Sequence, residues 1–315
     1  MNDLRIIFMG TPDFAVGILE GMLKNNYNIV GVITAPDKPA GRGQKIAISA
    51  VKEYALAKNL KLLQPTNLKN ETFLEELKAL NANLQIIVAF RMLPKVVWSM
   101  PEYGTINLHA SLLPDYRGAA PINWALINGE TKTGVTTFFI DEKIDTGAII
   151  LKNEIEIENN EYAGTLHDKL MELGKITILE TLELIKNNQI TTILQPQNEQ
   201  DKTAYKLNKE NCKIDFSKNI HQIYNHIRGL SPYPAAWCYF KDSKNEWSVK
   251  IYEVEKIEIE NNEPVGKLLF IEKSIMISVI GGLLNIKSIQ FPNKKRMKTE
   301  ELINGYKFNN QTIAY

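Results

Sequence analysis

The stretch from Thr105 to Pro121 reads Thr-Ile-Asn-Leu-His-Ala-Ser-Leu-Leu-Pro-Asp-Tyr-Arg-Gly-Ala-Ala-Pro, and we expect the fold to be organised around it. It begins as an apolar strand, in which side chains two positions apart share a face, so Asn107 and His109 point the same way. Pro114 then fixes the backbone of the following loop, and Gly118 lets it turn. An amide beside an imidazole at the end of a buried strand is costly in a purely structural element, so the stretch predicts a functional site.

Upstream of this stretch, apolar runs alternate with amphipathic helical patterns. The predicted strands are 5–10, 28–33, 61–65 and 84–90, and the predicted helices are 13–23, 49–58 and 70–80. This alternation predicts an α/β fold with a doubly wound, mostly parallel, Rossmann-like sheet, which binds ligands at the carboxyl ends of its strands. Gly10 is followed by no further glycine at the required positions, which excludes a dinucleotide-binding fingerprint.

The segment 34–45 is a long loop after the second predicted strand, and it carries the cations Lys38, Arg42 and Lys45. Loops of this length inside a compact α/β unit are usually functional or disordered. Arg42 stands between two glycines, which suits a guanidinium that reaches a phosphate. The alternative is an exposed loop whose charges only keep it solvated.

Downstream, strands are predicted over 134–140 and 148–157, and a long helix over 161–186. Asp145 lies in the turn between these strands, where a carboxylate is often positioned for function. The alternative is that Asp145 bonds its own backbone in an Asx-type turn.

The length of 315 residues suggests two domains. The polar segment 195–202 is the best linker candidate, and the domain bounds expected are 1–190, with a linker over 191–205 and a second domain over 206–315. After a helix over 217–229, short strands are predicted over 236–240, 249–254, 264–271, 275–279 and 283–290. Such a series predicts a small C-terminal β-barrel of the oligonucleotide-binding (OB-like) type.

The net charge of +1 hides a difference between the two parts, because residues 206–315 carry +5 and residues 1–205 carry −4. A basic second domain indicates a polyanionic partner, or else a solvated face without one.

Cys212 and Cys238 have no metal-type spacing and predict a reducing compartment. No apolar run approaches ~18 residues and no signal peptide begins the sequence, so we expect a cytoplasmic protein without a membrane segment.

Three side chains form the candidate catalytic set: Asn107, His109 and Asp145. A single histidine in a strand is more often a hydrogen-bonded core residue, but here an amide shares its face and a carboxylate loop is expected nearby. The set has no nucleophile with an ordered base and no metal-ligand pattern. The chemistry that remains is non-covalent proton transfer with an oxyanion to stabilise.

Several motifs resemble the 10-formyltetrahydrofolate-dependent formyltransferase family. They are Asn107-Leu-His109, Ser111-Leu-Leu-Pro114, Tyr116-Arg-Gly-Ala-Ala-Pro121 and Asp145-Thr-Gly147. Four others resemble the branch of the family that acts on an initiator tRNA: Gly10-Thr-Pro-Asp-Phe14, Pro36-Asp-Lys-Pro-Ala-Gly-Arg-Gly43, Ile227-Arg-Gly-Leu-Ser-Pro-Tyr-Pro234 and Lys294-Lys-Arg-Met297. The resemblance runs nearly from end to end of the chain.

The resemblance implies that the formyl group of 10-formyltetrahydrofolate passes to the free α-amino group of an initiator methionyl-tRNA. It implies that Asn107 and protonated His109 donate hydrogen bonds to the oxyanion, and that Asp145 assists proton movement. The implied folate contacts are Ser111, Leu112, Leu113, Pro114, Phe90, Met92 and Leu93. The implied tRNA contacts are Lys38, Arg42, Lys45, Lys294, Lys295, Arg296 and Lys298. A monomer without a metal ion is expected.

The sequence departs from the family pattern at two places near the site. Phe90-Arg91-Met92 replaces a Tyr-Gly-hydrophobic turn, and Lys143 and Ala148 replace a glycine and an acidic residue around Asp145. Two further functions remain open: the same fold acting on another amine or on water, and a non-catalytic RNA-binding protein. The Arg42 loop and the basic second domain favour a tRNA acceptor over a small one.

Overall fold

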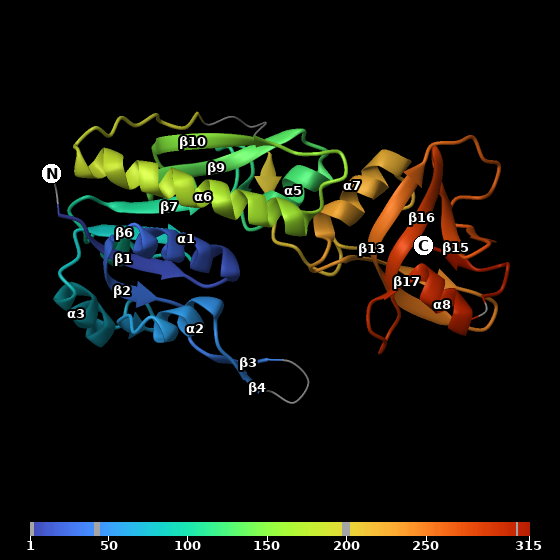
Figure 1. Ribbon diagram of the computed structural model, residues 1–315, viewed down its shortest axis with the longest axis horizontal. Coiled ribbons are helices and arrows are strands. Elements are labelled where there is room, and N and C mark those ends of the chain that lie inside the picture. The colour runs from blue at the N-terminus through green and yellow to red at the C-terminus, as the bar shows by residue number, and fades with distance from the viewer. Residues whose placement is uncertain (1–2, 41–44, 197–201, 307) are drawn as a thin grey trace. The chain divides into compact units, whose positions relative to one another are not determined.

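The computed structural model describes residues 3–40, 45–196, 202–306 and 308–315 (Figure 1). The chain divides into two units, each with its own core. The first comprises Met1–Gly118, Lys132–Ile155 and His167–Thr203, and the second comprises Ala119–Thr131, Glu156–Leu166 and Ala204–Tyr315. The domain bounds 1–190, 191–205 and 206–315 stay a prediction.

A seven-stranded sheet forms the first unit, in the order β10-β9-β7-β6-β1-β2-β5. Its strands are β1 (Arg5–Gly10), β2 (Asn28–Ile33), β5 (Leu62–Leu63), β6 (Leu84–Val88), β7 (Thr105–His109), β9 (Lys132–Phe139) and β10 (Ile149–Glu156). The neighbours from β7 through β5 are parallel, and β9 runs antiparallel to β7. The predicted mostly parallel sheet is confirmed.

Helices cover both faces of this sheet (Figure 1). They are α1 (Asp13–Lys24), α2 (Ala50–Ala57), α3 (Glu71–Ala79), α4 (Lys95–Trp98) and α6 (Ala163–Lys186). A Cβ built on Gly174 of α6 would lie 2.9 Å from a methyl of Leu108 and 3.0 Å from one of Ile18 in α1, so α1 and α6 share one face. On the other face, Ile87 of β6 packs with Phe73 of α3 and Val97 of α4. Burial on both faces explains why these strands are continuous apolar runs.

The register of β7 sets the direction of the candidate catalytic side chains. Asn107 lies beside Ile87 of the parallel strand β6, and neighbours in register share a face of the sheet. Leu108 points to α6 on the opposite face. Asn107 and His109 therefore share the face that carries α3 and α4, as the alternation along the strand predicts.

Two pairs of short strands were not expected from the sequence. The strands β3 (Lys38–Ala40) and β4 (Lys45–Ala47) form an antiparallel pair within the segment predicted as an irregular loop. The strands β8 (Arg117–Gly118) and β11 (Thr203–Ala204) form the second pair, so the end of the predicted linker is partly ordered as a strand.

The second unit contains a seven-stranded antiparallel sheet that curls into a nearly closed barrel, as predicted. The order is β14-β15-β16-β13-β12-β18, and β17 pairs with β16. Its elements are α5 (Pro121–Ile127), α7 (Ile220–Leu230), β12 (Ala236–Lys241), β13 (Glu246–Ile257), β14 (Leu268–Ile271), β15 (Ser274–Val279), β16 (Gly282–Gln290), β17 (Met297–Lys298), α8 (Thr299–Gly305) and β18 (Ile313–Ala314). Backbone bonds from Leu268 to Thr312 (3.1 Å) and from Ala314 to Gly266 (2.7 Å) nearly close the sheet.

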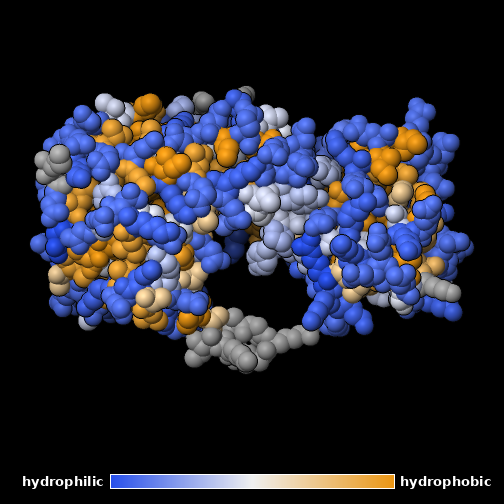
Figure 2. Space-filling view, viewed as in Figure 1, coloured by the Kyte–Doolittle hydropathy of each residue, from blue (hydrophilic) through white to orange (hydrophobic). Residues whose placement is uncertain are grey.

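The surface of both units is mainly hydrophilic on the face shown in Figure 2, and hydrophobic residues lie there in groups between hydrophilic ones. Among the described residues, no helix combines the length and the apolar character needed to cross a bilayer. The long helix α6 instead carries polar and charged side chains on its outer side, as in Glu172 and Glu180.

Gly134 in β9 is expected to tolerate no side chain. A Cβ there would lie 2.1 Å from the backbone oxygen of Asn153 and 2.5 Å from Leu112, and the backbone oxygen cannot move without disturbing the sheet. Gly134→Ala should lower the free energy of unfolding by about 1–3 kcal/mol, as overpacking does. Urea denaturation measures this change. The matched control is Gly305→Ala, where nothing lies within 4 Å, and an equal loss in both variants would contradict the prediction.

Candidate active site

The imidazole of His109 lies at the end of β7 between a carbonyl and a carboxylate. Its Nε2 atom is 2.8 Å from the backbone oxygen of Tyr116, and its Nδ1 atom is 3.8 Å from Oδ2 of Asp145. A carbonyl oxygen only accepts, so Nε2 carries a hydrogen and Nδ1 is the ring nitrogen that faces Asp145. The 3.8 Å separation is too long for a direct hydrogen bond, so the geometry allows a charge interaction or a bridged contact between the two side chains.

The carboxylate of Asp145 is fixed by a partner far away in the sequence. Its Oδ2 atom accepts a hydrogen bond of 3.0 Å from the backbone N–H of Gly118. The Asx-type turn in this loop is made by Asp141, which accepts from the N–H of Lys143 at 2.9 Å. The alternative in which Asp145 serves its own turn is therefore wrong.

Asp145 has φ of +55°, a left-handed conformation that non-glycine residues seldom adopt. Two residues later, a Cβ on Gly147 would lie only 1.6 Å from the backbone oxygen of Phe139. The loop thus approaches β9 closely, which requires glycine at this point. Left-handed non-glycine residues concentrate at functional sites, where the surroundings hold them in place.

The side chain of Asn107 is half-buried on the same face as His109. It makes no hydrogen bond to any other described residue, although its amide oxygen can accept hydrogen bonds and its NH2 group can donate them. The structure therefore leaves a free amide donor next to the histidine, as an oxyanion site requires.

The loop after β7 is held by hydrogen bonds to the sheet and within itself. Ser111 donates to the backbone oxygen of Asp115 at 2.7 Å, and Thr136 of β9 donates to the backbone oxygen of Ser111 at 2.7 Å. Leu113 donates through its N–H to Thr136 at 3.2 Å. Tyr116 has φ of +61°, which belongs to the turn that aims its carbonyl at His109.

The side chains predicted to contact folate differ in their accessibility. Leu93 packs in the cluster under α3 and α4, and Leu113 is fully buried against Phe138. Both support the wall of the site from inside. Met92 is 67% exposed, and Phe90, Leu112 and Pro114 are half-buried, so these side chains remain for a ligand to contact.

One of the departures from the family pattern, Arg91, has a structural role of its own. Arg91 donates to the backbone oxygens of Pro65 and Thr66, so its guanidinium ties this turn to the segment after β5. Next to Lys143, Glu142 pairs with Lys95 of α4 at 2.8 Å. The hydrogen bond from Lys95 lowers the pKa of Glu142 below its ordinary value, although both side chains are exposed and the pair is weak.

The cations predicted to contact tRNA are only partly described. Lys38 is exposed, whereas Arg42 and the side chain of Lys45 lie outside the described residues. In the second unit, Lys294, Lys295 and Lys298 are exposed.

Arg296 of the same cluster is already paired. Its guanidinium contacts Glu253 at 2.5 Å and lies over the ring of Tyr252, 4.6 Å from its centre. Its charge is therefore partly balanced by Glu253, whereas the neighbouring lysines pair with no carboxylate among the described residues.

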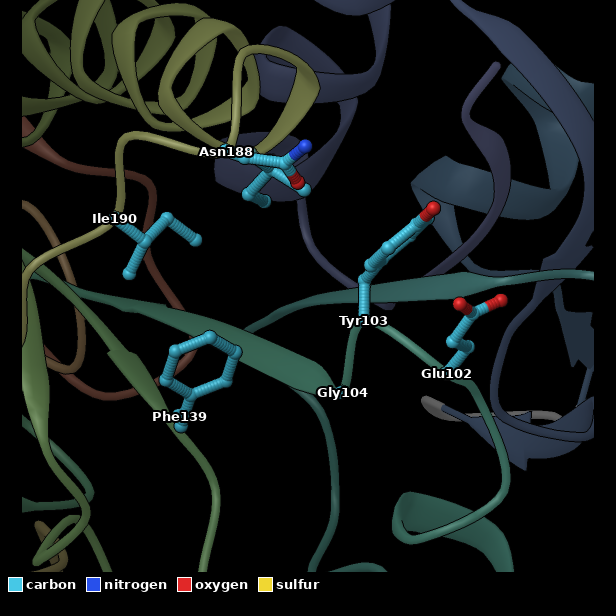
Figure 3. A pocket seen from close by; sticks show the side chains of 7 residues that line it. Glu102, Tyr103, Gly104, Phe139, Asn188 and Ile190 are labelled. Carbon is cyan, nitrogen blue, oxygen red and sulfur yellow. The ribbon is translucent and has the colours of Figure 1, made fainter. Parts of the chain in front are cut away.

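A hollow of about 470 Å³ lies at the end of β7 opposite His109 (Figure 3). It is lined by Glu102, Tyr103, Gly104, Phe139, Ile185, Asn188 and Ile190. Gly104 precedes β7, whereas His109 ends it, and at about 3.3 Å per residue the two ends of the strand are roughly 15 Å apart. This hollow is separate from the candidate catalytic set.

Within the described residues, no group of three or more His, Cys, Asp or Glu side chains could hold a metal ion.

Sequence reasoning missed two residues beside Asp145. Arg117 and Gln195 both donate to its backbone oxygen, at 3.1 and 2.9 Å. Arg117 belongs to the Tyr116-Arg-Gly motif, which was part of the family resemblance but did not indicate what the arginine does. Gln195 lies in the predicted linker, and nothing in the local sequence connects it with a residue 50 positions earlier.

The sequence of the chain matches two protein-family models. A family model for formyl transferase matches residues 4–182, and a model for the formyl transferase C-terminal domain matches residues 206–307. The chain belongs to the formyl transferase family and is an enzyme. The resemblance stated from the sequence is thereby confirmed.

Curated relatives that share one name match the chain over nearly its whole length. The methionyl-tRNA formyltransferase of Flavobacterium johnsoniae is 65% identical over 315 residues, covering 100% of both chains. That of Bacteroides thetaiotaomicron is 51% identical over 311 residues, covering 97% of each.

Solved structures agree with this fold. The sugar 3N-formyl transferase WlaRD, solved with dTDP and 5-N-formyl-THF, has a TM-score of 0.63 at 25% identity, covering 94% of this chain and all of WlaRD. HypX from Aquifex aeolicus, in complex with tetrahydrofolic acid, has a TM-score of 0.66 at 16% identity, covering 96% of this chain and 47% of HypX, and shows the shared fold alone.

Proposed function

We propose that this enzyme transfers the formyl group of 10-formyltetrahydrofolate to the α-amino group of initiator methionyl-tRNA. The observation that carries the proposal is the arrangement of His109 and Asp145, 3.8 Å apart, on the strand face that also carries Asn107, whose side-chain amide bonds to no described residue. The full-length relatives named methionyl-tRNA formyltransferase support this choice of acceptor. A monomeric state and a cytoplasmic location stay predictions from the sequence.

The reaction forms one C–N bond and breaks another. The amine attacks the formyl carbon, the carbonyl oxygen becomes an oxyanion, and the bond from that carbon to the folate nitrogen breaks as the nitrogen takes a proton. The amide N–H of Asn107 and the Nδ1–H of doubly protonated His109 are the donors for the oxyanion. Asp145 stabilises the imidazolium through its charge and relays the proton, directly or through water.

The chemistry of the site suits a folate donor. The exposed Met92 and the half-buried Phe90 and Leu112 offer apolar contact to flat ring systems, while Pro114 fixes the neighbouring backbone. Ser111 maintains the loop through Asp115. This donor would supply the activated formyl group, and the chain supplies orientation, the oxyanion donors and proton transfer.

The acceptor is expected to be held by cations. Lys38, Arg42 and Lys45 are assigned to the acceptor end, and Lys294, Lys295 and Lys298 to the phosphate backbone. Arg296 is assigned a smaller part than the sequence implied, because Glu253 balances its charge.

The decisive assay incubates the purified chain with 10-formyltetrahydrofolate and charged initiator tRNA. Charged elongator methionyl-tRNA, a nucleotide-linked amino sugar and buffer alone serve as competing acceptors. We expect formylmethionyl-tRNA from the initiator as the main product. Equal or faster transfer to the sugar, or release of formate to water, would contradict the proposed acceptor.

His109→Ala should lower turnover by at least ~100-fold, because it removes both a donor and the proton-transfer group. The same loss should appear in Asp145→Asn, and the double variant should be scarcely worse than the poorer single one, since groups that act as a unit are non-additive. Single-turnover formylation measures all three. Losses that multiply would show that the two side chains work independently. His221→Ala, an exposed histidine of α7, is the matched control.

Replacing Lys294 and Lys295 by alanine should weaken initiator and elongator tRNA binding alike. Each phosphate contact contributes roughly 0.7 to 0.9 to the slope of log affinity against log salt, so the double variant should flatten it by about 1.4 to 1.8. Titration at four salt concentrations measures the slope. The control removes the exposed Lys244 and Lys273, at other turns of the barrel. An unchanged slope in the first variant would remove the cluster from the tRNA site.

A further inference from the structure

The chain returns to the catalytic loop after α6, through a segment that we call the return segment, residues 193–196 and 202–203. Ile193 exchanges backbone hydrogen bonds of 2.8 and 2.9 Å with Ile149 of β10. The side-chain amide of Gln195 then donates to the backbone oxygens of Asp145 (2.9 Å) and Gly147 (2.8 Å). One side chain thus spans the two carbonyls on either side of Thr146.

Arg117 completes a closed set of hydrogen bonds around Gln195. Its Nη2 atom donates to the Oε1 atom of Gln195 at 2.7 Å, and its Nε atom donates to the backbone oxygen of Asp145 at 3.1 Å. Because a guanidinium only donates, it fixes which end of the Gln195 amide is the oxygen. The nitrogen end must therefore face the loop.

These contacts act on the backbone that aims the Asp145 carboxylate at His109. Asp145 holds a left-handed φ of +55°, a conformation that persists only where the surroundings impose it. Its carbonyl receives two donors, from Arg117 and Gln195, while its carboxylate receives Gly118 N–H. Without the two side-chain donors, this residue is free to relax toward an ordinary backbone conformation and to turn its carboxylate away.

The other end of the return segment holds the second partner of the histidine. The backbone N–H of Tyr116 donates to the backbone oxygen of Lys202 at 2.5 Å, and the carbonyl of Tyr116 faces Nε2 of His109. Both groups that contact the imidazole are therefore tied to the same returning stretch of chain.

We propose that Gln195 and Arg117 are positioning residues of the transfer reaction, and that the return segment is part of the active site. They act through Asp145, because both side chains donate to its backbone oxygen. This inference rests on the proposed formyl transfer, and its test separates the two. If the wild-type chain formylates no acceptor, the proposed function fails; if it does and the variants below match it, only this inference fails.

The test compares Gln195→Ala and Gln195→Glu with Leu194→Ala, whose 82% exposed side chain is the neighbouring control. Gln195→Glu keeps an oxygen for Arg117 but has no N–H for the two carbonyls. We expect kcat to fall by at least ~10-fold in both Gln195 variants with KM for both substrates nearly unchanged, because misplacement affects the transition state. Leu194→Ala should behave as wild type.

A double-variant cycle with Asp145→Asn gives the second readout. If Gln195 acts through Asp145, adding Gln195→Ala to Asp145→Asn should cause little further loss. A further loss equal to that in the wild-type background would overturn the proposal. So would full activity of Gln195→Glu, since it would reduce Gln195 to a tether for Arg117. A crystal structure of Gln195→Ala in which Asp145 keeps its left-handed φ would equally contradict it.

Discussion

The hydrogen bond from His109 to the carbonyl of Tyr116 is the contact on which the site depends. Because that carbonyl occupies Nε2, Nδ1 is the ring nitrogen that faces Asp145, at 3.8 Å. The direction of the imidazole follows from one backbone oxygen. Strand β7 determines which face of the sheet carries Asn107 and His109, because its pairing with β6 and β9 fixes the direction of both side chains.

Two non-glycine residues in left-handed conformations, Tyr116 and Asp145, provide the two groups on either side of this ring. Such conformations cost roughly 1–3 kcal/mol each, so other contacts must offset them. The offset comes from elements that are distant in sequence: Lys202 bonds the N–H of Tyr116, while Gln195 and Arg117 bond the carbonyl of Asp145. The two groups beside the imidazole are thus bonded to the chain that follows α6, and not to the sheet alone.

The local patterns of the sequence were sufficient to predict the sheet, the barrel and the shared face of Asn107 and His109. Strand alternation and apolar runs can be seen in residues that are neighbours in the sequence. They could not assign the turn role to Asp141 instead of Asp145, since both lie in the same polar loop and only tertiary contact with Gly118 separates them. For the same reason Arg296 looked like a free cation, although Glu253 on β13 pairs with it across the sheet. Long-range pairing of polar groups leaves no periodic signal.

Catalytic chemistry and acceptor choice are separable problems in this fold. A solved structure of a sugar 3N-formyl transferase shares the fold over 94% of this chain, so the fold does not by itself select an acceptor. For the proposed tRNA acceptor, selection is expected from groups that a large polyanion can reach. Lys294 and Lys295 are exposed and pair with no carboxylate among the described residues, whereas Arg296 pairs with Glu253. A contact of this kind raises affinity for any phosphate backbone and carries no information about its sequence, so recognition of one particular nucleic acid requires directional contacts as well.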